Sequence, residues 1–425
     1  MHFFRKAFAI SAFAILCYPA FSVAATSSAS ISLEDAIRTT LEKNPQLVGY
    51  NFRVKALDGE RQTANLRPAL NLSSDLENVA GSGTLKGTDS SELTISLSSV
   101  IELGGKRDAR LGLVTARQQQ LESEQRVLTL DVLSSVTHQF IQLIAAQEQL
   151  ALQKEANQLA QKTLQSLTRL VQAGRTPDAE LLRGKAAFAR AEIALQQAEQ
   201  NVRNERLKLS AFWADPTPDF TFAKADIYAL PPAVALPYLQ SQLSNNPDLL
   251  LLADIVKVRA ASLRQARTGG RSDLTWSAGV RRLQESGDSA MVVGLSMPLG
   301  SSRRATGAIT TATAEQQSAE LEHDSTRIQL ESELTGLFEQ HQQALNELNT
   351  LRAQVLPALK SAQRTTAEGF EAGRYSYLEF NLAQNELLDA QQAFIEAASR
   401  VQQTRIELER LTGASLSQQN FEVTP

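Results

Sequence analysis

The chain has 425 residues, of which 42 are basic and 46 are acidic, so its formal net charge is −4, and only 6% of its residues are aromatic. Because no basic stripe offsets this acidic balance, the composition argues against a nucleic-acid partner. Glutamine, alanine, leucine, glutamate and arginine dominate long stretches, which favours long helices over compact aromatic cores.

The N-terminus has the parts of a secretory signal peptide. Arg5 and Lys6 precede an apolar run that ends at Cys17, and small residues follow, which predicts a signal peptide over residues 1–25. Cys17 is the only cysteine, so the mature chain is expected to carry no disulfide and no thiolate ligand. No later stretch supplies the ~20 consecutive apolar residues of a transmembrane helix, so none is expected.

An internal repeat organises the rest of the chain. Short landmarks recur in the same order about 200 residues apart, which indicates a tandem duplication. The first repeat is predicted over 26–212 and the second over 240–425. A proline-rich crossover over 213–239 joins them. The clearest landmarks are Asn44-Pro45 with Asn246-Pro247, and Ala173-Gly174-Arg175 with Ala372-Gly373-Arg374.

Each repeat contains two stretches in which apolar and polar residues alternate. In one of them Leu93, Ile95 and Leu97 alternate with Thr94 and Ser96. Strands of about ten residues with one apolar and one polar face suit a transmembrane β-barrel, whereas the alternative is an amphipathic sheet of a soluble sandwich. Strands are predicted at about 69–79, 92–103, 273–284 and 290–299.

Four strands cannot close a barrel, since the smallest single-chain barrels have about eight. Unpaired edges cannot face lipid, so several chains must share one barrel. Two chains would supply eight strands and three would supply twelve. Strand counting alone leaves both possibilities open.

Long helical hairpins follow the strands. They are predicted at about 106–212 and 303–413. The first helix of the first hairpin, from Lys106 to about Ala173, would be roughly 100 Å long. Pro357 predicts a kink or junction in the second hairpin. Before the strands of the first repeat, one helix is predicted from the cap at Ser32 to Arg67, where Pro68 ends it.

A glycine-rich turn connects a strand to a helix at Gly104-Gly105-Lys106-Arg107. A phosphate-binding loop would need an upstream glycine and a serine or threonine after the lysine, and this segment has neither. A turn from strand to helix is therefore predicted, and Lys106 and Arg107 are candidates to meet lipid headgroups.

The sequence offers no catalytic or metal-binding constellation. The mature histidines, His138, His323 and His341, are not paired at helical spacing, and no cysteine assists them. Zinc and copper sites favour those ligands. We therefore expect no enzyme activity, no cofactor and no metal site.

Together these ordered features resemble the TolC family of outer-membrane efflux factors across nearly the whole mature chain. The features are the Leu33-Glu34-Asp35-Ala36 start, the Asn-Pro elements, the strand pairs and the Ala-Gly-Arg turns. The segment from Ile101 to Arg107 is similar to the heavy-metal subgroup typified by CzcC.

The resemblance implies an α+β membrane protein of a Gram-negative bacterium. Its fold would be a homotrimer with a twelve-stranded outer-membrane β-barrel that continues into a periplasmic α-helical barrel. The implied function is the passive exit duct of a tripartite efflux system, with divalent heavy-metal cations as candidate substrates. The implied partners are outer-membrane lipid, a periplasmic adaptor of the membrane-fusion type and an inner-membrane transporter of the resistance-nodulation-division (RND) type.

The resemblance also assigns roles at the hairpin turns. By position, the acidic ring at the periplasmic aperture maps onto Glu379, with Glu180 as its counterpart in the first repeat. The alternative is that both are solvated helix-start glutamates stabilised by the helix dipole. The tip residues expected to face the adaptor are Gly174, Arg175, Asp178, Gly373 and Arg374.

Two other functions remain open at this point. The same architecture would serve the exit duct of a type I protein-secretion system. A periplasmic coiled-coil scaffold without a pore would also explain the long helices.

Overall fold

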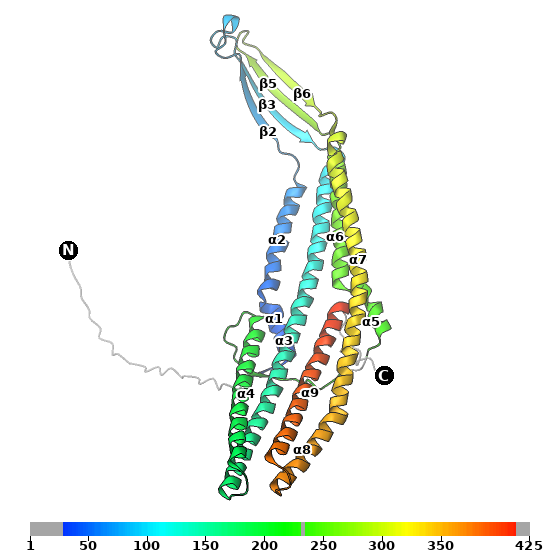
Figure 1. Ribbon diagram of the computed structural model, residues 1–425. Coiled ribbons are helices and arrows are strands. Elements are labelled where there is room, and N and C mark those ends of the chain that lie inside the picture. Colours follow the sequence, from blue (N-terminus) through cyan, green and yellow to red (C-terminus); the bar gives the residue numbers. More distant parts are fainter. Residues whose placement is uncertain (1–28, 231–233, 414–425) are drawn as a thin grey trace, which may run out of the picture.

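The computed structural model describes residues 29–230 and 234–413. The predicted signal peptide lies outside the described residues. Figure 1 shows an elongated molecule with a β-sheet at one end and two helical hairpins whose turns lie at the other end.

The first repeat begins with two helices. Helix α1 spans Leu33–Lys43 and α2 spans Pro45–Asn65. The prediction of one helix from Ser32 to Arg67 is therefore wrong. Pro45 has no N–H to donate, and a residue before proline is driven out of the helical region, so Asn44 is extended, with φ −63° and ψ 122°.

The first helical hairpin consists of α3 (Lys106–Gln172) and α4 (Asp178–Ala211). The second repeat has α5 (Leu236–Gln242), α6 (Pro247–Gly269), α7 (Ser301–Thr350), α8 (Leu356–Glu371) and α9 (Tyr377–Thr412). A π-helical turn, Leu351–Val355, joins α7 to α8 immediately before Pro357. Proline removes one backbone donor, which is a common cause of such local widening.

The four main strands are β2 (Asn71–Glu77), β3 (Glu92–Ile101), β5 (Leu274–Leu283) and β6 (Ser289–Ser296). They form one antiparallel sheet in the order β2-β3-β5-β6. The hairpins of the two repeats therefore join through β3 and β5. Strands β2 and β6 form the two edges.

A second, small sheet was not predicted. Strand β1 (Ala29–Ile31) pairs in parallel with β4 (Phe220–Ala223), which lies in the proline-rich crossover. The Gln147 side chain of α3 holds β4 by donating to the Ala223 carbonyl at 2.9 Å and accepting from the Ala223 N–H at 2.8 Å. The crossover is thus fixed to the helices.

The largest apolar core lies where the crossover meets the helices, about halfway along the molecule. It combines side chains from both repeats and from the crossover. Members that are at most 2% exposed include Phe140, Leu143 and Ile144 of α3, Leu209 of α4, Ile227 of the crossover, Leu348 and Val401.

One described helix, α3, contains a stretch long and apolar enough to cross a membrane by length and composition alone. The stretch is apolar on average, but polar residues such as His138 and Gln139 interrupt it, so it is not the run of consecutive apolar residues whose absence the sequence predicted. Core helices meet the same criterion, and Phe140, Leu143 and Ile144 supply the apolar core described above.

Candidate functional site

The four-stranded sheet exposes its apolar face. The register places Leu72, Leu97 and Val293 in one row across the sheet, and Ile95, Val280 and Met291 in the next. Partners across an antiparallel pair point to the same side. These side chains are 38% to 81% exposed, which is the reverse of a soluble sandwich.

The opposite face is polar and internally bonded. Arg281 of β5 forms ion pairs with Glu77 of β2 at 3.0 Å and Glu92 of β3 at 2.7 Å. Its Nε donates to Thr94 Oγ1 at 3.0 Å. The sheet therefore separates an apolar surface from a polar one, as a membrane barrel wall does.

The predicted strand-to-helix turn forms at Gly104 and Gly105, whose φ angles are +79° and +72°. These left-handed values suit glycine. Lys106 pairs with Asp273 at 2.7 Å, and Arg107 donates to the carbonyl and the side chain of Asn65 at 2.9 and 2.6 Å. Both cations are therefore used to join segments within the protein, which does not support the lipid headgroup role suggested for them.

The two hairpin turns have the same backbone design. Gly174 donates to Val171 O at 2.9 Å and Arg175 N donates to Leu170 O at 2.9 Å. The equivalent bonds in the second repeat are Gly373 N to Phe370 O at 3.0 Å and Arg374 N to Gly369 O at 2.8 Å. Both arginines are exposed at the turns, and Asp178 begins α4.

Glu379 closes a capping box at the start of α9. Its carboxylate accepts from Ser376 N and Ser376 Oγ, both at 2.8 Å, and Ser376 Oγ accepts from Glu379 N at 3.3 Å. These hydrogen bonds hold the pKa of Glu379 below its usual value. Glu379 is therefore exposed, ionised at neutral pH and fixed in orientation.

Glu180 has a different environment. Its side chain is 19% exposed and accepts from Arg183 at 3.2 Å, whereas its Oε2 is buried and has no hydrogen-bond partner among the described residues. Burial raises the pKa of Tyr377 on the other hairpin, Arg190 opposes that rise, and the charge of Glu180 adds to it. Glu180, the glutamate of the first repeat, thus lies toward the second hairpin rather than in free solvent.

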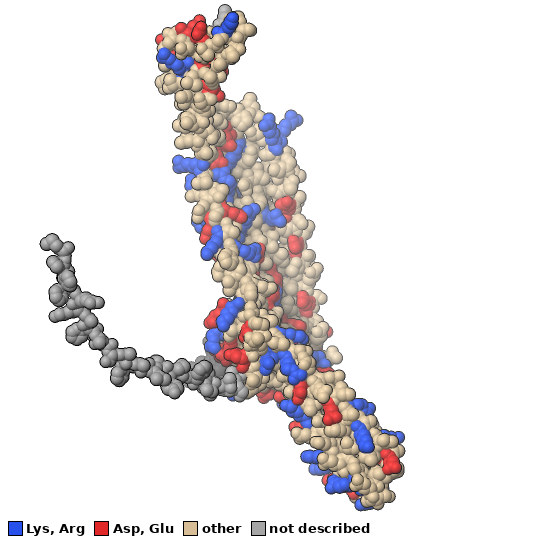
Figure 2. Space-filling model, turned by 90° about the vertical axis from the view of Figure 1, so that its left-hand side faces the viewer, with Lys and Arg blue, Asp and Glu red and all other residues tan. Residues whose placement is uncertain are grey.

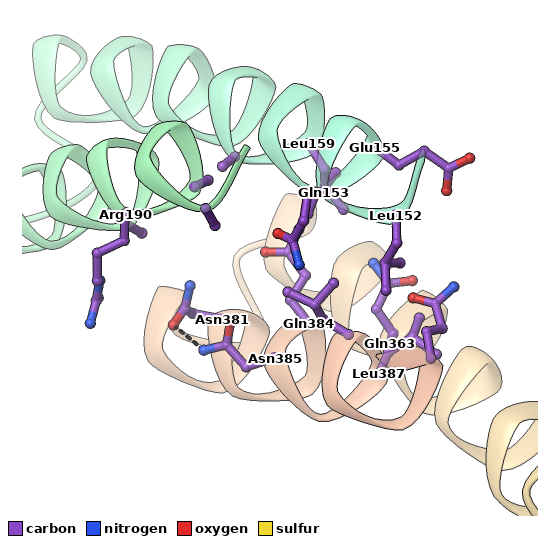
Figure 3. A pocket seen from close by; sticks show the side chains of 17 residues that line it. Leu152, Gln153, Glu155, Leu159, Arg190, Gln363, Asn381, Gln384, Asn385 and Leu387 are labelled. Atoms are coloured by element: carbon purple, nitrogen blue, oxygen red, sulfur yellow. Dashed lines mark hydrogen bonds between the residues drawn. The ribbon is translucent and has the colours of Figure 1, made fainter. Parts of the chain in front are cut away.

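A groove of about 440 Å³ separates the two hairpins near their turns. The wall formed by α3 and α4 is mostly leucine and alanine, with Gln153, Glu155 and Arg190 among them. The wall formed by α8 and α9 is mostly amide side chains, together with Leu387 and Leu388. Figure 3 shows Asn381, Gln384 and Asn385 directed into this space, with Asn385 donating to Asn381 at 3.1 Å. The groove was not predicted from the sequence, although the sequence does show that amide residues recur along α9.

Within the described part of the chain, no group of three or more histidine, cysteine, aspartate or glutamate side chains is arranged to hold a metal ion.

An exposed apolar sheet attached to long helical hairpins defines a class of outer-membrane channel proteins. Residues 36–215 and 238–414 match the outer membrane efflux protein family, and the chain belongs to that family. It is an outer-membrane efflux channel whose helical part extends into the periplasm.

The chain is similar to the cobalt-zinc-cadmium resistance protein CzcC of Cupriavidus metallidurans. The two are 27% identical over 383 residues, which cover 90% of each protein. Two solved structures share the fold. A membrane protein from Pseudomonas aeruginosa has a TM-score of 0.77 at 15% identity and 90% coverage of both chains. CusC has a TM-score of 0.76 at 15% identity, with 90% of this chain and 92% of CusC covered.

Proposed function

We propose that three copies of the chain form the passive exit duct of a tripartite efflux system. The observation that carries the proposal is the sheet with an exposed apolar face and a polar, ion-paired opposite face. Strand β2 pairs only with β3 and strand β6 pairs only with β5 among the described residues, so the outer side of each edge strand has no partner strand there. An unpaired edge cannot face lipid, so edges of neighbouring copies pair with one another.

Three copies supply twelve strands, and their polar faces line the lumen. The helical hairpins of the three copies then continue the lumen as a tube into the periplasm. The turns of the hairpins, with Arg175, Asp178 and Arg374, meet a periplasmic adaptor that connects the duct to an inner-membrane RND pump. The duct lets cargo pass and catalyses no reaction.

We further propose divalent heavy-metal cations as the cargo. Support comes from the likeness to a cobalt-zinc-cadmium resistance protein. A strain lacking the gene should tolerate several-fold less cobalt, zinc or cadmium in its growth medium, and the intact gene should restore tolerance. Unchanged metal tolerance together with loss of one exported protein would contradict efflux and indicate a secretion duct.

Glu379 is proposed to line the periplasmic aperture, with Glu180 contributing less because it is partly covered. Carboxylates around a constriction favour cations. Glu379→Gln removes the charge but keeps a side chain able to close the capping box. Single-channel recording in a planar bilayer should show a reduced cation-to-anion permeability ratio for this variant and for Glu180→Gln with Glu379→Gln.

Glu34→Gln is the matched control, because Glu34 lies on α1, far from the hairpin turns in Figure 1. Its selectivity should equal that of the unmodified channel. Unchanged selectivity in the double variant would refute the aperture role while leaving the duct itself standing.

A further inference from the structure

One charged side chain lies on the apolar face of the sheet. Arg282 is paired with Leu93 of β3 and Ser289 of β6, and Leu93 is paired in turn with Leu76 of β2. Partners across antiparallel strands share a face, so Arg282 projects on the side of the exposed leucines. It is the only charged residue that the four strands place on this face.

The position of Arg282 along the sheet matches one boundary of a bilayer. The row of Leu274 and Ile101 lies at the other end of β5, eight residues away. That separation is roughly 27 Å along the strand. For a strand with the usual tilt of a membrane barrel, this separation is roughly 20 Å along the membrane normal, and the apolar band of such barrels is about 25 Å tall. Leu299, which is 84% exposed, continues the apolar surface beyond β6 at the helix end, so the polar boundary at the loop end falls at Arg282.

Arg282 is also available for a ligand. Its neighbour Arg281 is held by Glu77 and Glu92 on the polar face, whereas Arg282 is exposed and forms no ion pair with any residue that the structure describes. A Cβ built at Gly287 would lie 3.9 Å from Arg282 Nη2, so the guanidinium leans toward the β5–β6 turn. Figure 2 shows further charged side chains gathered at this loop end.

We propose that Arg282 binds a phosphate group of a lipid in the outer leaflet, with the lipid chains lying on the apolar face of the sheet. The inference rests on the proposed function, in which this face meets lipid. A guanidinium recognises phosphate through two parallel hydrogen bonds, and a long arginine at the edge of an apolar surface reaches the headgroup level. The helices leave the sheet at the opposite end and are periplasmic, so the loop end faces the outer leaflet.

The test measures binding of diphosphoryl lipid A to the purified channel in detergent by native mass spectrometry. Arg282→Gln should bind about tenfold more weakly, because its amide can keep one of the two hydrogen bonds but loses the other and the charge. Arg282→Lys should fall between the two, because it keeps the charge but not the paired donors. Arg281→Gln, the adjacent control on the polar face, should bind as the unmodified channel does. Fully dephosphorylated lipid A should not distinguish the variants.

Equal lipid A affinity in Arg282→Gln would overturn the inference, as would an equal loss in Arg281→Gln. Displacement of lipid A by an equal concentration of inorganic phosphate would also overturn it, because the site would then prefer a free anion. Bilayer conductance measured on the same preparations separates the two claims. Absence of channels in the unmodified protein would refute the proposed duct, whereas normal channels with equal lipid affinity refute only the role of Arg282.

Discussion

Replacing Asn246 with alanine should destabilise the junction between α6 and α9 by about 2–4 kcal/mol. The side chain is fully buried and makes two bonds at once. Its Oδ1 accepts from Leu249 N at 3.0 Å, which caps α6, and its Nδ2 donates to Leu411 O at 2.7 Å, which closes the end of α9. Losing the cap costs about 1 kcal/mol. Leaving the buried carbonyl unpaired costs about 1–3 kcal/mol more.

The first repeat contains the same arrangement. Asn44 Oδ1 accepts from Gln46 N at 2.9 Å, and Asn44 Nδ2 donates to Phe212 O at 2.8 Å, at the end of α4. Each asparagine therefore joins the start of the helix that leads to the strands, α2 or α6, to the end of the last hairpin helix of its own repeat, α4 or α9. Asn44→Ala should have a smaller effect, because Asn44 is 6% exposed and water can partly replace it.

Hydrogen exchange followed by mass spectrometry is the direct assay. Protection of the Leu249 amide and of the last turn of α9 should fall by roughly 30- to 700-fold in Asn246→Ala, since each 1.4 kcal/mol is about a factor of ten. Asn245→Ala is the matched control, because Asn245 is exposed and its side chain donates only to Gln242 at 3.3 Å. Protection at Leu249 that stays within about threefold in both variants would refute the reasoning.

Two further predictions concern packing and pH. Gly369→Ala should destabilise the second hairpin turn by about 1–3 kcal/mol, because the new Cβ would lie 2.0 Å from the Tyr375 ring. Gly336→Ala, where nothing lies within 4 Å, should instead raise the thermal midpoint, and equal midpoints would contradict the packing argument. Burial lowers the pKa of His138 and His341, so the unfolded chain binds more protons than the folded one. Stability should therefore fall as the pH drops below about 6.5 and level off below the folded pKa. Between pH 7 and pH 5 the thermal midpoint should fall in the unmodified protein and stay constant in the His138→Gln, His341→Gln double variant. Equal falls in the two proteins would exclude the histidines as the cause.

The strands could be predicted because their pattern is local. Alternation in residues 92–103 has the period of a pleated strand, and the observed strand Glu92–Ile101 has that alternation on its two faces. The left-handed turns were also readable, since Gly104, Gly174 and Gly373 stand where φ is positive. These features depend on a few neighbouring residues.

Other features depend on distant contacts or on short motifs that have more than one possible structural role. Asn44-Pro45 served as a repeat landmark, yet it also ends one helix and starts the next. The spacing of Ser376 and Glu379 is that of a capping box, which gives Glu379 a more specific local role than the helix-start position considered from the sequence. Strand β4 has four residues and forms through packing against the helices, which no local pattern specifies.

The position of Glu180 was equally beyond local reasoning. Whether a helix-start carboxylate faces a lumen or a neighbouring hairpin depends on how the two hairpins pack, and that packing arises from side chains such as Leu167, Tyr377 and Phe380. Sequence symmetry predicts equivalent glutamates. The structure makes them unequal, because one is exposed and capped and the other is partly covered.

Disulfide cross-linking between sheet edges tests the shared barrel most directly. The only native cysteine is Cys17, so cysteines placed in pairs, one along β2 and one along β6, would be the only thiols of the mature chain. Within one chain these edges are three strand spacings apart, roughly 14 Å, which is beyond the reach of about 7 Å for a disulfide. Oxidation in intact outer membranes should therefore give a covalent ladder that ends at three chains. A ladder that ends at two chains, or no cross-linking at any β2–β6 pair, would contradict the twelve-stranded barrel.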